Sequence, residues 1–175
     1  MKEEYFMNDF GFYEVSVDEL GNACEMIGKD WMLITVSDGD AANAMTASWG
    51  SLGVLWNKNV LTCFIRPQRY TYALAEENDR MSFAILPEAY RNALRYCGSH
   101  SGRSTHKIVD AGLSTCKIDG VPVIKEADTV LICRKLYADD LKENSFLDPA
   151  LLSNYESKDF HRMYICEIEK VLKKK

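Results

Sequence analysis

The segment CGSHSGRSTHK, residues 97–107, combines hydroxyl side chains with two glycines, two histidines and two cations, and it lacks any large apolar residue. Because a helix is predicted to begin at residue 104, backbone N–H groups of its first turn would face this segment, where they and the helix dipole favour an anion such as phosphate. The segment would add hydroxyl donors, a glycine for close backbone approach and positive charge: Ser99, Ser101, Ser104, Gly102, Arg103 and Lys107. It does not match the Walker A pattern, and a solvated loop between helices is the alternative.

A second polar cluster, FIRPQRYT at residues 64–71, places Arg66 and Arg69 around Pro67. The cluster lies at the end of a predicted strand and just before a predicted helix. Guanidinium groups match phosphate oxygens geometrically, and the helix start would supply a second set of donors. An exposed charged corner is the alternative, but two such corners indicate an anion site more strongly than either does alone.

A third segment, NAMTASWGSLGVLW at residues 43–56, has small and polar residues followed by an aromatic and glycines. Small residues would let a flat ring approach the backbone, whose N–H and C=O groups can hydrogen-bond the edge of a heterocycle. The alternative is an ordinary strand with a glycine-containing turn. In that case Trp49 and Trp56 would be core aromatics.

The surrounding sequence predicts mainly strands, which are short, rich in β-branched or aromatic residues and bounded by turn residues. They are residues 31–37, 44–49, 61–65, 81–86, 129–138 and 160–172, with turns at WNKN (56–59) and DGVP (119–122). Three helices are predicted over 71–78, with Thr71 as N-cap, over 88–96, and over 104–111, which ends before Gly112. Helices do not separate the strands regularly, as a parallel βαβ fold requires, so we expect an antiparallel barrel with peripheral helices.

Length and composition favour one domain over residues 1–175, because 47% of the residues are apolar and no linker or repeat interrupts them. The net charge of −5 argues against general nucleic-acid binding. No apolar run approaches the roughly 20 residues that span a bilayer, and the acidic N-terminus does not resemble a secretory signal. We therefore expect a cytoplasmic protein without membrane contact.

Six scattered cysteines form no C-x-x-C pair and are expected to be free thiols. A zinc site of Cys97, His100 and His106 would lack a fourth ligand at a recognised spacing, so no metal is predicted. Cys97 itself has two interpretations. A thiol beside a phosphate loop could be reactive, or it could serve only to place its backbone, and we favour the structural role.

Together, NAMTASWG, RPQRYT, YCGSHSGRSTHK and the closing RKLYADDL…DFHRMYICEIEKVL resemble the flavin reductase-like, FMN-binding split-barrel family, in particular its flavoredoxin-type members. The resemblance runs from about Gly28 to Leu172. It implies a six-stranded antiparallel Greek-key split β-barrel with peripheral helices. It also implies a homodimer that holds FMN in a groove near the subunit interface.

The resemblance assigns three groups of residues to FMN. The isoalloxazine and ribityl groups would be bordered by Thr46, Ala47, Ser48 and Trp49. The ribityl-phosphate path would be lined by Arg66, Gln68, Arg69 and Tyr70. The phosphate would be cradled by Cys97, Ser101, Gly102 and Lys107. The chain departs from the family in having Ser104 and His106 where acidic residues are familiar, and Cys166 where glycine is; His106 could make phosphate binding depend on pH.

The implied activity is hydride transfer from NADH or NADPH to flavin N5, followed by electron delivery to an acceptor. No G-x-G-x-x-G motif occurs, so the nicotinamide would dock transiently over the flavin, and no side chain is assigned an acid or base role. The alternative is a flavoredoxin-type carrier that a partner protein reduces. A third possibility is a binding module without flavin, since a fold alone does not define a function.

Overall fold

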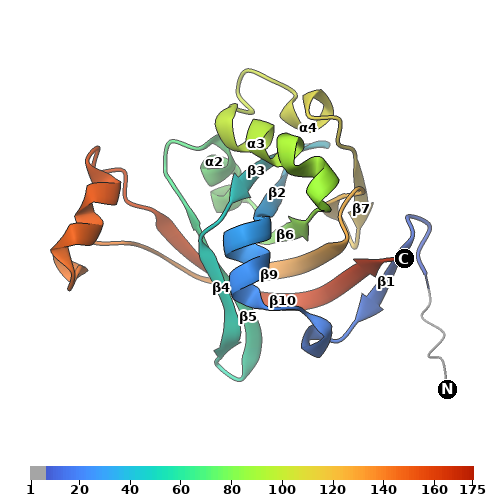
Figure 1. Cartoon of the computed structure of the whole chain (residues 1–175), viewed down its shortest axis with the longest axis horizontal. Coiled ribbons are helices and arrows are strands. Elements are labelled where there is room, and N and C mark those ends of the chain that lie inside the picture. The colour runs from blue at the N-terminus through green and yellow to red at the C-terminus, as the bar shows by residue number, and fades with distance from the viewer. Residues whose placement is uncertain (1–6) are drawn as a thin grey trace.

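The computed structural model describes residues 7–175 and consists mainly of antiparallel strands, with the helices at Tyr70–Glu77, Arg91–Ser99 and Lys107–Asp110 gathered along one side (Figure 1). The strands are β1 Phe12–Val15, β2 Met32–Asp38, β3 Ala41–Ala47, β4 Gly50–Leu55, β5 Lys58–Ile65, β6 Arg80–Ile85, β7 Thr115–Ile118, β8 Val121–Ile124, β9 Thr129–Asp140 and β10 Arg162–Lys174. The α-helices are α1 Ala23–Glu25, α2 Tyr70–Glu77, α3 Arg91–Ser99 and α4 Lys107–Asp110. Short helices of other types are η1 Val17–Glu19, η2 Met26–Asp30, η3 Glu88–Tyr90, η4 Glu143–Ser145 and η5 Pro149–Tyr155.

The main sheet has the strand order β3-β2-β6-β9-β10-β5-β4, and β1 adds an eighth strand by pairing with β10. All of its neighbouring strands are antiparallel, while β7 and β8 form a separate hairpin. The mainly β class is therefore confirmed. The main sheet has eight strands where six were predicted, because β4 pairs with β5 and β1 pairs with β10 in addition to the six.

Each predicted strand is present, and the hairpin predicted at WNKN joins β4 to β5. Its two turn residues, Trp56 and Asn57, have φ of 53° and 57°, the left-handed conformation that two-residue hairpins favour because its twist matches that of the strands. The short strands β1, β7 and β8 were not predicted. Each is four residues long, too short for a clear alternating pattern.

The helix boundaries differ from the predictions around the polar segments. Helix α3 continues to Ser99, whereas α4 has only four residues and begins at Lys107. Thr71 is not the N-cap of α2. Arg69 occupies that position, and the buried Thr71 hydroxyl instead accepts a hydrogen bond from Asn43 Nδ2 at 2.8 Å. No helix among residues 7–175 is long and apolar enough to cross a membrane.

Two buried apolar clusters lie on opposite faces of the central strands. Ile34 of β2 packs with Phe83 and Leu131 in the first cluster, whereas the neighbouring Leu33 belongs to the second cluster, with Leu94 of α3. Alternate residues of a strand point to opposite faces, so β2 must be apolar on both. The second cluster fixes α3 against the sheet and thereby places the end of α3 beside β3.

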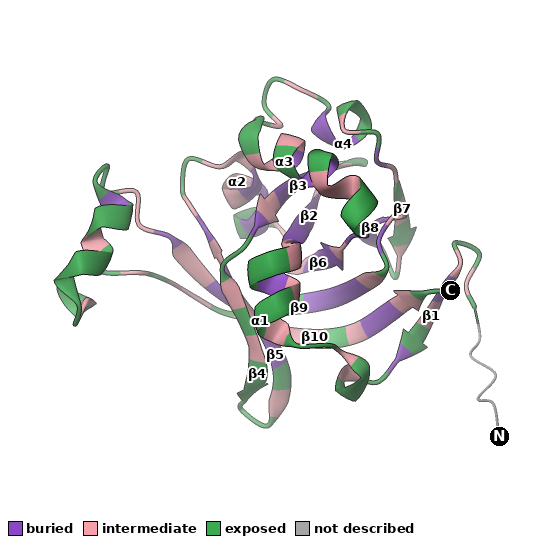
Figure 2. Ribbon diagram, viewed as in Figure 1, coloured by how far each residue is buried: buried purple, intermediate pink, exposed green. Residues whose placement is uncertain are grey.

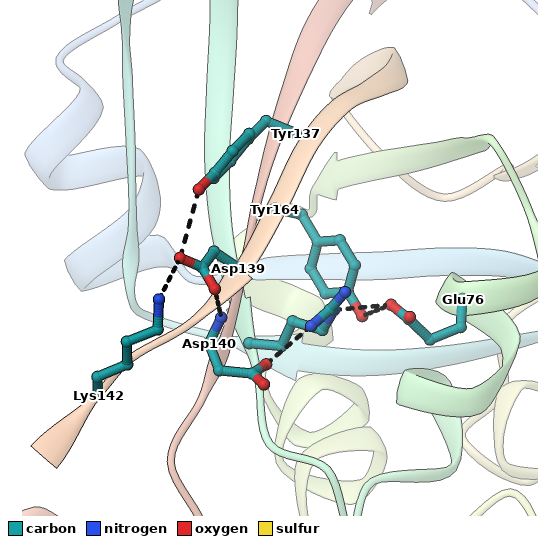
Figure 3. A network of polar contacts seen from close by, with 7 residues as sticks. Glu76, Tyr137, Asp139, Asp140, Lys142 and Tyr164 are labelled. Carbon is teal, nitrogen blue, oxygen red and sulfur yellow. Dashed lines mark hydrogen bonds and ion pairs between the residues drawn. The ribbon is translucent and has the colours of Figure 1, made fainter.

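Residues 141–161, here called the arm, leave the body of the protein between β9 and β10 and carry η4 and η5 (orange in Figure 1). Most of the arm is exposed (Figure 2). Its base is held by polar contacts (Figure 3): Arg162 pairs with Asp140 at 2.9 Å and with Glu76 at 3.0 Å, and Glu76 also accepts a bond from the Tyr164 hydroxyl. These contacts fix where the arm returns to the main sheet.

Candidate functional site

A cavity of about 230 Å³, here called the aromatic cavity, opens where β3, β4, β5 and the start of β10 meet. It is lined by three rings, from Trp49, Phe64 and His161. Its remaining lining residues are Met45, Thr46, Ala47, Ser48, Arg66, Arg69 and Gly98. The structure thus brings all four residues of the predicted ring edge to one cavity with two predicted cations.

The edge of the aromatic cavity is built by residues that contacts with neighbouring elements hold in place. Thr46 donates its hydroxyl proton to the Leu94 carbonyl oxygen at 2.6 Å, which ties β3 to α3. Trp49 keeps 46% of its surface exposed, so its indole is not a core aromatic. Its ring lies 5.1 Å from the His161 ring at an interplanar angle of 49°. A flat ligand could therefore contact the indole without unpacking the core.

The sequence analysis did not predict four residues of this cavity, His161, Met45, Phe64 and Gly98, and of these His161 carries the titratable group. It was part of the quoted segment DFHRMY, but a lone histidine at a strand start gave no reason to select it. The side chain is 8% exposed, and its Nδ1 lies 2.9 Å from the Tyr155 hydroxyl. Burial, assisted by the charge of Arg66, lowers the pKa of His161 to about 4, so the imidazole is neutral at pH 7.

Arg66 and Gln68, predicted for the ribityl-phosphate path, both contact Asp159 of the arm. The guanidinium of Arg66 lies 2.6 Å from Asp159 Oδ2 and also donates to the Asn154 carbonyl oxygen at 2.9 Å. Gln68 Nε2 donates to the same Asp159 oxygen at 2.6 Å. Hydrogen bonding from Arg66 lowers the pKa of Asp159. The charge of Arg66 is therefore already compensated by a carboxylate.

A second pocket of about 190 Å³, here called the cation pocket, adjoins the aromatic cavity at Arg69, which lines both. Its lining contains two of the four residues predicted to cradle the phosphate, Ser101 and Lys107, but not Cys97 or Gly102. It also contains Gln68, Arg69 and Tyr70, predicted for the ribityl-phosphate path, together with Ser99 and His100. Within residues 7–175, Arg69 and Lys107 have no carboxylate within ion-pair distance. The cation pocket thus carries two uncompensated positive charges.

Arg69 is the N-cap residue of α2 and Lys107 is the first residue of α4, but the charged groups of both side chains contact the C-terminal end of α3. Arg69 donates to the Gly98 carbonyl oxygen at 2.8 Å, and Lys107 Nζ lies 3.3 Å from the Cys97 oxygen and 3.2 Å from the His100 oxygen. Carbonyl groups at a helix C-terminus carry partial negative charge and attract cations. The helix dipole therefore orients Arg69 and Lys107, and any anion would be held by these side chains.

Burial changes the acidity of both lysine and thiol in this region. Lys107 is 4% exposed, and desolvation together with the charge of Arg69 lowers its pKa to about 8. Cys97 is buried in α3, and desolvation raises the pKa of its thiol to about 11. A protonated, buried thiol is a poor nucleophile, which supports the structural role of Cys97. Cys97 lines neither the aromatic cavity nor the cation pocket.

Other predicted residues of the segments 64–71 and 97–107 make contacts within the protein. A Cβ atom on Gly102 would lie 2.1 Å from Asn43 Oδ1 and 2.9 Å from Tyr70 Cδ1, so glycine is required by packing within the protein. The Tyr70 hydroxyl donates to Asp38 at 2.9 Å, and the guanidinium of Arg103 lies 5.2 Å from the centre of the Tyr70 ring. Ser101 is exposed at the mouth of the cation pocket.

A larger cavity of about 530 Å³ lies on the other side of Lys107, between the β2–β3 turn and α4. Its lining includes Asp38, Asn43 and His106 but no phenyl, phenol or indole ring. The aromatic cavity is thus the better candidate for a flat ligand. Within residues 7–175, no group of three or more histidine, cysteine or acidic residues is placed to hold a metal ion.

Comparison with known proteins agrees with this geometry. The family model described as "Flavin reductase like domain" matches residues 26–174, and the chain belongs to this family. No curated protein sequence matches the chain.

Among solved structures, an FMN-binding domain of a flavin reductase-like enzyme from Shewanella baltica OS155 matches with a TM-score of 0.68 and 15% identity, over 93% of this chain and 77% of its own. Flavoredoxin from Methanosarcina acetivorans matches with a TM-score of 0.63 and 22% identity, over 81% and 67%. The NADH:FAD oxidoreductase of Streptomyces globisporus C-1027 matches with a TM-score of 0.60 and 15% identity, over 83% and 81%. At these identities the similarity shows that the fold is shared.

Proposed function

We propose that this protein binds FMN and acts as an NAD(P)H-dependent flavin oxidoreductase that passes electrons on to an acceptor. One observation carries the proposal: the aromatic cavity and the cation pocket meet at Arg69. A flavin mononucleotide has a flat heterocycle at one end and a phosphate at the other. The two adjoining pockets offer rings to the first and uncompensated cations to the second.

The side chains of the cation pocket have the donors that a phosphate needs. A guanidinium has five N–H groups. Within residues 7–175 the Arg69 guanidinium makes one hydrogen bond, to the Gly98 oxygen. The ammonium of Lys107 contacts two carbonyl oxygens and has three N–H groups. Both cations therefore retain donors for phosphate oxygens, and the exposed Ser101 hydroxyl adds one more.

A bound flavin would supply the redox chemistry, accepting hydride from NADH or NADPH and releasing electrons to an acceptor. The protein's own part is to hold the ring between Trp49 and the small residues of β3, and to anchor the phosphate through Arg69 and Lys107. Trp49 is open to solvent, which leaves room for a nicotinamide to approach the ring from outside. No residue is assigned an acid or base role.

A carrier that a partner protein reduces is the second candidate, because flavoredoxins are among the solved structures with this fold.

We further propose a homodimer. Val54 is 73% exposed and Trp56 54% exposed at the β4–β5 hairpin, and Tyr137 of β9 lies beside Trp56 at 6.4 Å between ring centres. A second copy would cover this apolar surface.

We also propose a cytoplasmic location, because the six free cysteines suit a reducing compartment.

The test is the visible spectrum of the protein reconstituted with FMN, followed anaerobically as NADH and then NADPH are added. We expect flavin bands that bleach with at least one nicotinamide. Bands that persist until a reducing partner protein is supplied would favour the carrier. Failure to retain FMN at all would refute the flavin assignment and leave a binding module of another kind.

A further inference from the structure

The His161 side chain has a hydrogen-bonding atom that the protein does not use. Its Nδ1 lies 2.9 Å from the Tyr155 hydroxyl, and among residues 7–175 its Nε2 has no hydrogen-bond partner. Within the same residues, the one fully buried side-chain polar atom without a partner is the Thr35 hydroxyl. The Nε2 atom is therefore not sealed off by protein, and the His161 side chain lines the aromatic cavity.

The contacts of Tyr155 fix the position of the proton on this imidazole. Tyr155 is buried, and among the described residues its hydroxyl has one acceptor within reach, Nδ1 of His161. A buried hydroxyl donates wherever an acceptor is available, so we assign the hydrogen bond as Tyr155 O–H to Nδ1. The neutral imidazole must then carry its own proton on Nε2. His161 thus presents an uncharged N–H donor on the cavity side.

The groups packed around His161 keep it neutral. Arg66, which follows β5, and Asp159 of the arm are the charged groups nearby, and they form an ion pair with each other at 2.6 Å. The other faces are covered by rings: Trp49 at 5.1 Å, Phe64 at 6.4 Å and Tyr155 at 5.6 Å between ring centres. An imidazolium would be poorly solvated in these surroundings, so the N–H donor remains uncharged at neutral pH.

We propose that His161 is a ligand-contacting residue that donates its Nε2–H to an acceptor atom, a carbonyl oxygen or ring nitrogen, of the flavin ring held in the aromatic cavity. Tyr155 is the positioning residue that sets the donating tautomer. This inference rests on the proposed flavin binding. Reduction makes the acceptor atoms of a flavin ring more electron-rich, so a fixed donor stabilises the reduced form and raises the midpoint potential.

The first experiment examines the tautomer without any flavin. Long-range proton–nitrogen NMR of protein labelled at histidine distinguishes the two tautomers of each imidazole, and His161→Phe identifies the signals of His161. We expect a neutral Nε2–H imidazole at pH 7, and a shift toward the Nδ1–H form in Tyr155→Phe. Tyr137→Phe, which removes an exposed hydroxyl outside the cavity, is the matched control and should leave these signals unchanged. A native Nδ1–H form would overturn the inference.

The second experiment adds FMN to the same samples. We expect the His161 signals to move on binding, FMN affinity to fall about fivefold in His161→Phe, and the midpoint potential to fall with it. His161→Gln, which keeps an N–H donor, should recover most of both losses. A circular dichroism spectrum confirms that each variant is folded.

The outcomes separate this inference from the proposed function. If FMN binds to the native protein but the His161 signals do not move, and His161→Phe matches the native affinity and potential, then this inference is wrong and the flavin assignment stands. If the native protein does not bind FMN, the proposed function fails and the inference fails with it, whatever the tautomer.

Discussion

The aromatic cavity and the cation pocket each contain an arginine from one short segment, RPQR, yet the two arginines have different environments. Arg66 pairs with Asp159 at 2.6 Å and lies 5.2 Å from the centre of the Tyr155 ring, so its charge is compensated and it attaches the arm to the end of β5. Arg69 contacts the carbonyl oxygen of Gly98 and no carboxylate within residues 7–175. Burial lowers the pKa of Arg69, but a guanidinium remains charged at neutral pH.

The difference shows that the residue type alone does not define an anion site. A cation that already has a carboxylate partner contributes little further attraction for an anion. A cation that contacts neutral carbonyl groups keeps most of its attraction for an anion. Positive charge is therefore retained in the cation pocket and at Arg69, where the two pockets meet, whereas the Trp49 side of the aromatic cavity carries no uncompensated charge. We expect a ligand with its phosphate on the Arg69 side and its ring on the Trp49 side.

The largest expected effect comes from removing Arg69. Arg69→Ala should weaken FMN binding by about 1.5–3 kcal/mol, the usual loss for a charge-assisted hydrogen bond, and change riboflavin binding little, because riboflavin has no phosphate. Quenching of flavin fluorescence measures both dissociation constants. Arg66→Ala is the matched control, since it removes an arginine whose charge is compensated. If Arg69→Ala weakened both flavins equally, Arg69 would not contact the phosphate.

A smaller effect follows from the acidity of Lys107. With a pKa of about 8, the ammonium loses its charge as pH rises from 7 to 9, while a phosphomonoester remains a dianion throughout. The preference for FMN over riboflavin should therefore decline across this range, and in Lys107→Met it should be lower at pH 7 and flat.

The effect on stability has the opposite sign. The pKa of Lys107 lies below its value in the unfolded chain, near 10.4, so the buried charge disfavours folding below pH 8, and this penalty disappears as pH rises toward 10.4. Urea unfolding of the native protein and of Lys107→Met measures that difference. A decline in FMN preference that persisted in Lys107→Met would show that another group titrates.

The smallest expected effect is at Asp159. Asp159→Asn removes the charge that pairs with Arg66 and weakens the contact with Gln68. It should lower the affinity for both flavins alike, by less than about tenfold, because the Arg66–Asp159 pair is partly solvated. Arg66 lowers the pKa of Asp159, so the Arg66–Asp159 ion pair in the native protein should persist at neutral pH and be lost only as pH falls below the usual range of an aspartate pKa. A selective gain in FMN affinity in Asp159→Asn would instead place Arg66 in the phosphate path.

Some features could be predicted because they depend on neighbouring residues. The hairpin turn at Trp56 and Asn57, the strand of Met32–Asp38 and the glycine after α4 follow from local backbone preferences and alternation. The end of α3 could not be predicted. Gly98 and Ser99 are weak helix formers, but α3 continues through them because Lys107 and Arg69 bond to its last carbonyl groups.

The sequence by itself determined the mainly β class, the strand positions and the three polar segments that supply most of the cavity residues. Only the tertiary structure decided which of those residues are free to bind. Asp159 lies 93 positions from Arg66 and compensates its charge. The ammonium of Lys107 contacts the end of α3, and the His161 ring lies against that of Trp49. Charge compensation, burial and proton position depend on contacts between distant segments, and local propensity contains no information about those contacts.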